Sequence, residues 1–143
     1  MAKFEKQLTA NDVGLTKTHQ AGIHIPKGAK ELLSTLPALN PRIRNPDTWF
    51  DCMDEHGLVW RFRYIYYNSK LFGDGTRDEY RLLQINPFLK HNKAKEGDFL
   101  TIELKSEKYF VGIRKDSDEV SQILDKNYVP PPKIKLKGWR EVH

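Results

Sequence analysis

Apolar and polar residues alternate along several short stretches of the chain, and this period-two pattern indicates β-strands rather than long helices. The clearest stretch is residues 58–67 (LVWRFRYIYY), whose alternate positions are leucine, tryptophan, phenylalanine and two tyrosines. Arg61 and Arg63 fall on the opposite side of the same stretch. Residues 48–53 (TWFDCM) precede it across the turn-forming DEHG, so the two stretches predict a hairpin with one face in the core.

Five further stretches have the length and composition of strands. They are residues 3–9 (KFEKQLT), 23–26 (IHIP), 80–85 (YRLLQI), 99–104 (FLTIEL) and 108–114 (KYFVGIR). Apolar spacing of three to four predicts a short helix over 26–36, and acidic residues in the first turn favour another over 116–128. Asn86 is the expected N-cap of a helical turn over 86–92. About seven short strands with two or three short helices predict a mostly β, barrel-like domain.

Two segments do not fit this pattern. Residues 10–22 (ANDVGLTKTHQAG) are rich in loop-forming residues and long for a simple turn. Residues 129–143 begin with a valine and three prolines and continue with lysines alternating with apolar residues, which suits either an edge strand or a linker. We therefore expect a domain over residues 1–128 and a Pro/Lys-rich tail or linker over 129–143.

The amino-acid composition says less about the function than the alternation of apolar and polar residues says about the fold. The net charge of +5 favours a polyanionic partner without identifying it. The single cysteine, Cys52, lies in an apolar strand and excludes an internal disulfide framework. Since there is also no apolar run of about 18 residues, we expect a cytoplasmic protein that does not contact a membrane.

One catalytic pattern is present. Asp47 after a proline, together with Glu103 and Lys105 in the order Glu-Leu-Lys, matches a split signature of metal-dependent nucleases, in which carboxylates bind Mg²⁺. Both halves are common by chance and lie far apart in the sequence. Glu103 and Lys105 also fit the solvent face of an ordinary strand, so the nuclease remains an alternative.

A binding pattern lies in TRDEYR. Arg77, Glu79 and Arg81 point the same way in an extended chain, and an arginine fork can donate to guanine while a glutamate accepts from cytosine. The same residues would also suit a hairpin that carries weak surface ion pairs. Residue types alone leave these two interpretations open, as they do for the polar loop that contains Lys17, Thr18, His19 and Gln20.

Residues 8–27 (LTANDVGLTKTHQAGIHIPK) resemble the opening of the N-terminal effector domain of the EcoRII restriction endonuclease family. The stretches WRFRYIYYNSK, GTRDEYRL and KEGDFLTIEL follow in the order of that domain, and they also resemble plant B3-type DNA-binding domains. The resemblance implies an open seven-stranded pseudobarrel with two short helices, which grips the DNA major groove with two arms.

The resemblance also implies roles for particular residues and for partners. The N-arm would be Asn11 to Ile25 and the C-arm Gly73 to Arg81. The implied DNA-binding residues are Lys17, Thr18, His19, Gln20 and His24 in the N-arm and Arg77, Asp78, Glu79 and Arg81 in the C-arm, with Arg61, Arg63 and Lys70 as candidates for the DNA backbone. Such a domain would bind a CC(A/T)GG-like double-stranded site as a monomer and without a cofactor, in a prokaryotic cytoplasm.

Two further expectations follow from the same resemblance. Catalysis would belong to a Mg-dependent nuclease domain of the same chain or of a partner chain. A transcription factor with this fold is the other possibility. Lys17 and Thr18 depart from the family, which often has glycines at these positions, and this departure leaves the details of the N-arm contacts open.

Overall fold

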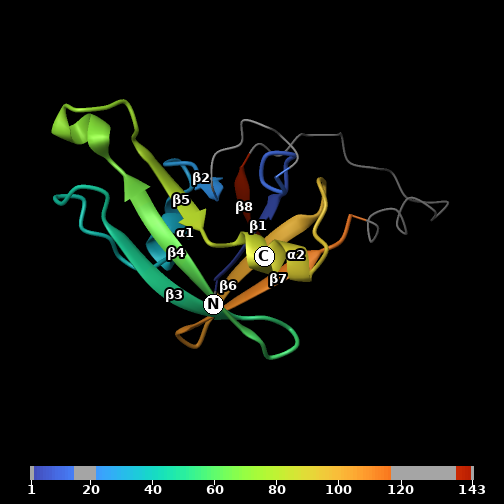
Figure 1. The fold of residues 1–143 in the computed structure, drawn as a ribbon. Coiled ribbons are helices and arrows are strands. Elements are labelled where there is room, and N and C mark those ends of the chain that lie inside the picture. Colours follow the sequence, from blue (N-terminus) through green and yellow to red (C-terminus); the bar gives the residue numbers. More distant parts are fainter. Residues whose placement is uncertain (1, 15–21, 117–137, 143) are drawn as a thin grey trace.

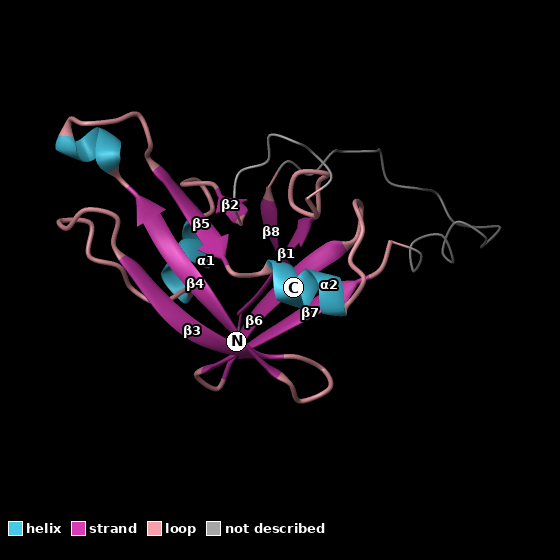
Figure 2. Cartoon of the chain, in the orientation of Figure 1, coloured by secondary structure: helices cyan, strands magenta, loops and turns pink. Residues whose placement is uncertain are grey.

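The computed structural model describes residues 2–14, 22–116 and 138–142, and strands are the main regular elements of this part of the chain (Figures 1 and 2). The strands are β1 (Ala2–Gln7), β2 (Ile23–Ile25), β3 (Asp47–Met53), β4 (Val59–Tyr67), β5 (Glu79–Leu83), β6 (Phe99–Lys105), β7 (Lys108–Arg114) and β8 (Trp139–Val142). The helices are α1 (Lys30–Thr35), α2 (Asn86–His91) and the 3-10 helix η1 (Ser69–Phe72). The expected mostly β, barrel-like fold is confirmed.

A single sheet curves around the core in the order β2-β5-β4-β3-β7-β6-β1-β8. All neighbouring strands are antiparallel except β3 and β7, which pair in parallel through Cys52 and Met53. The two edge strands, β2 and β8, are joined by a side chain, because the Trp139 indole N–H donates to the His24 carbonyl at 3.1 Å. The barrel is therefore open at one seam, and a tryptophan bridges the opening.

Strand β4 follows the predicted alternation except at Ile65, which lies on the side of the two arginines and yet is buried, while Leu58, predicted on the core side, precedes the strand and is exposed. Phe62, Tyr64 and Tyr66 are buried, whereas Arg61 is exposed and Arg63 is partly exposed. Phe62 contacts Phe50 and Phe88 edge-on, with ring centroids 6.2 and 6.0 Å apart. This aromatic packing joins β3, β4 and α2 in one core.

The two α-helices contribute apolar side chains to that core. In the view of Figure 1, α1 lies behind β4 and α2 in front of the sheet. Leu32 of α1 and Phe88 of α2 are almost fully buried. The prediction of Asn86 as N-cap is wrong by one residue: Ile85 is the cap, and its carbonyl accepts from the Leu89 N–H at 3.1 Å. Ile85 is itself buried in the core, and α2 begins without a side-chain hydrogen bond from its cap residue.

Strand β8 shows that the predicted tail contains an edge strand, one of the two alternatives for residues 129–143. It lies within the predicted tail, yet it pairs with β1 in the register Lys3 with Val142 to Lys6 with Trp139, and it raises the strand number from the expected seven to eight. The Arg140 side chain secures it, because its Nε donates to the Glu5 carboxylate at 2.5 Å. The predicted helix over 116–128 lies almost wholly outside the described residues, as does the rest of the tail up to residue 137.

No helix within the described residues is both long and apolar enough to span a membrane.

Candidate nucleic-acid interface

The described part of the N-arm contains one of its predicted DNA-binding residues, His24. Lys17, Thr18, His19 and Gln20 lie outside the described residues. His24 projects outward from β2 between the buried Ile23 and Ile25, directly opposite Arg81 of β5. Partial burial and the positive charge of Arg81 lower the pKa of His24, so at neutral pH its imidazole is uncharged. A neutral imidazole can both donate and accept a hydrogen bond.

Three of the four DNA-binding residues predicted for the C-arm are in contact with one another. Arg77 donates from Nε and Nη2 to Glu79 Oε1 at 3.0 and 2.7 Å, and Arg81 Nη2 lies 3.4 Å from Glu79 Oε2. Burial alone would raise the pKa of Glu79, but the hydrogen bonds from both arginines lower it, and the carboxylate stays charged. The three side chains thus lie together, as both interpretations of TRDEYR require.

Their exposure differs, however. The side chain of Arg77 is 46% exposed, while those of Glu79 and Arg81 are 20% and 8% exposed. The Arg77 guanidinium also stacks on the Tyr67 ring, 3.6 Å from its centroid. Arg77 is thus the outermost member of the group, and it is held from two sides by Tyr67 and Glu79.

Asp78 has a different environment from its neighbours. Its carboxylate accepts from the Lys27 ammonium at 2.6 Å and from the Tyr66 hydroxyl. The hydrogen bond from Lys27, followed by that from Tyr66, lowers the pKa of Asp78. Asp78 therefore ties the base of the C-arm to the segment after β2 and to β4.

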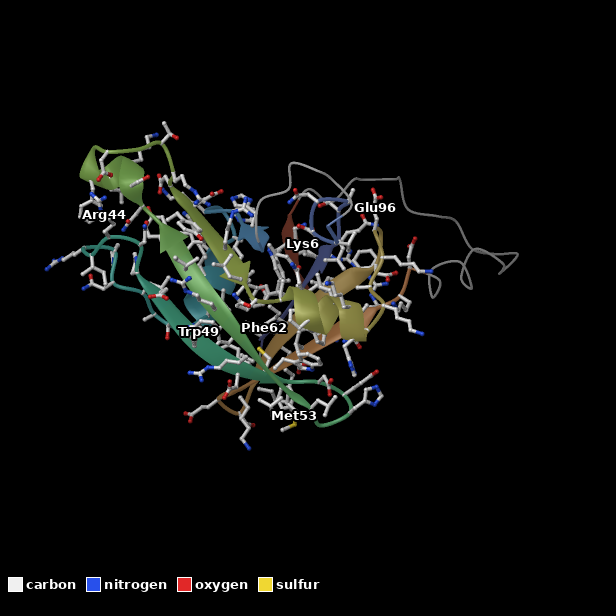
Figure 3. All side chains as sticks on the ribbon, viewed as in Figure 1. Lys6, Arg44, Trp49, Met53, Phe62 and Glu96 are labelled. Atoms are coloured by element: carbon white, nitrogen blue, oxygen red, sulfur yellow. The ribbon has the colours of Figure 1, made fainter. Side chains whose placement is uncertain are left out.

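Sequence reasoning did not find Lys27, Tyr66 or Arg44 as partners of the C-arm. Arg44 forms an ion pair with Asp74 at the tip of the arm, and it lies beside η1 in Figure 3. Lys27 and Arg44 are separated from their partners by long stretches of sequence, so no local pattern could signal these pairs. Their positive charge was the only feature of the sequence that suggested an ionic partner.

The three candidates for the DNA backbone lie in different places. Lys70 is in η1 next to the C-arm, where its N–H donates to the Arg77 carbonyl at 3.0 Å. Arg63 is ion-paired with Asp47 at 2.6 Å, and Arg61 lies over the Trp49 ring at 5.7 Å, both on the outer face of the β3–β4 hairpin. Because Arg61 is six positions before Tyr67 along the extended β4, about 20 Å separates it from the C-arm. The structure brings only Lys70 together with the arm.

The residues of the nuclease alternative do not meet. Asp47 begins β3, whereas β3 meets β7 only at Cys52 and Met53, and Glu103 lies one strand farther, opposite Phe110. Five residues of extended chain and two strand spacings put the two carboxylates well beyond the separation at which they could share one cation. No cluster of acidic, histidine or cysteine side chains able to hold a metal occurs among the described residues.

Comparisons with known proteins agree on one group. The family model described as "Restriction endonuclease EcoRII, N-terminal" matches residues 1–95. The type II restriction enzyme EcoRII of Escherichia coli is 41% identical over 87 residues, which are 55% of this chain and 20% of that enzyme. The chain thus matches about one fifth of the length of this curated relative.

Two solved structures have a similar fold. The Arabidopsis FUS3–DNA complex aligns with a TM-score of 0.59 at 26% identity and covers 80% of this chain and 98% of that one. The B3 domain of the UbaLAI restriction endonuclease, solved with cognate DNA, aligns with a TM-score of 0.55 over 98% of this chain and 85% of that one. At 20% identity, this second likeness concerns the fold alone.

Proposed function

The chain belongs to the family of EcoRII restriction endonuclease N-terminal domains, and on this premise we propose that it is a sequence-specific, double-stranded DNA-binding domain. It binds the major groove between an N-arm and a C-arm, and it has no catalytic activity of its own. Cleavage belongs to a Mg-dependent nuclease domain of the same chain or of a partner chain. The two similar structures, both solved with DNA, support this proposal.

The proposal rests mainly on how the Arg77 side chain is held at the surface. A guanidinium that recognises a base must present a fixed fork of donors, and an arginine that is free to rotate loses entropy when it binds. Tyr67 and Glu79 hold Arg77 in place before any ligand arrives, while nearly half of its side chain stays open to solvent. This arrangement suits bidentate recognition of guanine O6 and N7.

We assign the remaining contacts by position. Glu79 and the largely buried Arg81 support Arg77 from within the C-arm, and His24 contributes from β2, opposite Arg81. Lys17, Thr18, His19 and Gln20 act in the N-arm, and Lys70 binds a phosphate beside the C-arm. The target is a CC(A/T)GG-like site bound by one copy of the domain, so that each arm meets about half of it.

A competition gel-shift experiment tests this function. The labelled duplex contains CC(A/T)GG, and the competitor has the same length and base composition but two permuted base pairs in the site. Each wrong base pair costs about 1–3 kcal/mol, so the permuted duplex should bind about 30-fold more weakly or worse. Equal affinity for the two duplexes would refute the proposed specificity.

A further inference from the structure

A short proline-rich segment lies beside the C-arm. Residues 40–46 (NPRIRNP), which we call the strap, lead directly into β3. The strap contains two arginines, Arg42 and Arg44, and no acidic residue. In Figure 1 it forms the loop next to η1.

The strap is fixed to the base of the C-arm by a buried asparagine. Asn68 has no exposed surface, and its Nδ2 donates to the Ile43 carbonyl at 2.8 Å. Asn45 and Asn68 also bond reciprocally, each backbone N–H donating to the other's side-chain Oδ1, at 2.8 and 3.2 Å. The Tyr66 N–H adds a bond to the Pro46 carbonyl at 3.0 Å. The strap and the C-arm are therefore connected through buried, satisfied hydrogen bonds, which favours one relative position.

The charged side chains of the strap remain at the surface. Arg44 is exposed, lies over the Phe72 ring at 5.5 Å and pairs with Asp74. Arg42 is exposed too, and in the described part of the chain no ion pair involves its side chain. Ile43 between them is 53% exposed, so the arginines are not covered by packing from neighbouring segments. The strap thus presents positive charge on a rigid support.

The order of the strands indicates which part of a bound duplex would lie near the strap arginines. The N-arm leads into β2, the C-arm connects β4 to β5, and the strap enters β3, which neighbours β4 on the side away from β5 and β2. The strap consequently lies beyond the C-arm as seen from the N-arm. Two strand spacings between β5 and β3 amount to about 10 Å, which corresponds to about three base pairs of a duplex.

From this arrangement we propose that the strap is a third DNA contact, in which Arg42 and Arg44 bind phosphates of the duplex that flanks the recognition site on the C-arm side. The inference rests on the proposed function. Guanidinium groups form charge-assisted hydrogen bonds with phosphate oxygens, and binding releases counterions. Such contacts position the protein on the duplex without adding sequence information.

Duplexes of two lengths test the proposal. Both contain CC(A/T)GG, one with about 2 flanking base pairs on each side and the other with about 8, enough to pass beneath the strap. We expect the wild-type protein to bind the longer duplex about tenfold more tightly. Arg42→Gln should reduce this gain, and Arg42→Gln combined with Arg44→Gln should abolish it while binding of the short duplex stays unchanged. The slope of log affinity against log salt on the long duplex should fall by about 1 for each arginine removed.

A matched control uses two exposed lysines of the β6–β7 turn, Lys105 and Lys108. Lys105→Gln combined with Lys108→Gln removes the same net charge at the end of the barrel away from the C-arm (Figure 1), so the gain from longer flanks should persist. Circular dichroism melts verify that each variant is folded.

Two results would overturn the proposal: the double arginine variant keeping the full gain, or losing affinity equally on both duplexes. Failure of the proposed function looks different, since wild-type protein would then bind CC(A/T)GG and its permuted form alike. The comparison of flank lengths can still be made in that case, because phosphate contacts do not depend on sequence.

Discussion

Arg77 is held by an aromatic ring on one side and a carboxylate on the other. Substitutions at this position can therefore separate the effect of the positive charge on DNA binding from the effect of the guanidinium geometry. Arg77→Ala should weaken binding of the cognate duplex by about 1–3 kcal/mol and change the affinity for a permuted duplex much less. Arg77→Lys keeps the charge but loses the planar fork, so it should resemble alanine on the cognate site. Fluorescence anisotropy with both duplexes measures the two affinities.

Arg61→Ala is the matched control for this experiment, because it removes an exposed arginine about 20 Å down the same strand. It should leave both affinities unchanged. An equal loss for Arg77→Ala and Arg61→Ala would mean that only net charge matters, which contradicts base recognition by Arg77.

Cys52 illustrates a residue whose chemistry is suppressed by its surroundings. Burial, with a smaller effect of the Asp51 charge, raises the pKa of the thiol to about 12. The thiol has no accessible surface. At neutral pH it is therefore both protonated and out of reach of reagents, and each of these prevents its reaction. A disulfide reagent such as DTNB should react with the denatured protein within minutes and with the native protein only as fast as it unfolds. Rapid reaction of native protein would show that the strand opens locally.

At the scale of elements, period-two alternation predicted the strands well, because the inner face of each strand must be apolar to fill the barrel. Phe62 and Tyr64 are buried where the pattern places them, and Arg61 is exposed. The same reasoning allowed an edge strand within residues 129–143 but could not identify its partner, since the position of β8 depends on Glu5 and His24, far away in the sequence. Nor could it find the strap, whose fixed position depends on one buried asparagine.

The candidate site was predictable to a similar extent. The spacing of Arg77, Glu79 and Arg81 placed them on one side, but it did not distinguish the exposed Arg77 from the buried Arg81. That difference arises from β2 lying against β5, which is a long-range contact. The role of Asp78 depends likewise on Lys27 and Tyr66. Such contacts between distant parts of the chain produce no periodic pattern in the sequence.

Asn68 allows a prediction for the strap as an element. Asn68→Ala removes the acceptor of the Asn45 N–H and the donor to the Ile43 carbonyl. Leaving buried backbone groups unpaired should lower the free energy of unfolding by about 2 kcal/mol. Urea denaturation followed by circular dichroism measures this change, and the m-value should stay constant.

Asn40→Ala is the comparison for Asn68→Ala, since Asn40 is an exposed strap residue whose side chain accepts one backbone bond, from the Arg42 N–H. We expect its effect to stay within about 0.5 kcal/mol. If the two variants were equally stable, the buried bonds of Asn68 would not be what holds the strap.

For the whole molecule, Glu5 connects three strands. Burial of its carboxylate alone would raise its pKa, but hydrogen bonds from Arg114 of β7 and Arg140 of β8 lower it. A carboxylate with a lowered folded-state pKa stabilises the protein above its unfolded pKa of about 4.5, and this stabilisation is lost as the pH falls through the folded-state value. The wild-type protein should therefore lose stability as the pH is lowered below this point.

Glu5→Gln tests that linkage. The variant should be less stable than wild type by about 1–3 kcal/mol at pH 7, because neutral glutamine loses the charge-assisted bonds. It should also lose less stability between pH 7 and pH 3, as urea denaturation at each pH would measure. An unchanged pH dependence would assign the acid sensitivity to other carboxylates, such as Asp98, whose pKa is also lowered.

The pairing of β1 with β8 has a consequence for how the domain can be handled. Lys3 lies opposite Val142, and both strands have these ends near the β6–β7 turn, since Ala2 is paired with Leu104. A fluorophore, a surface anchor or a fused protein attached at either end would leave the barrel on the side away from the C-arm. Tethering through either end should consequently present the DNA-binding arms outward in the same orientation, which suits single-molecule and surface-based binding assays.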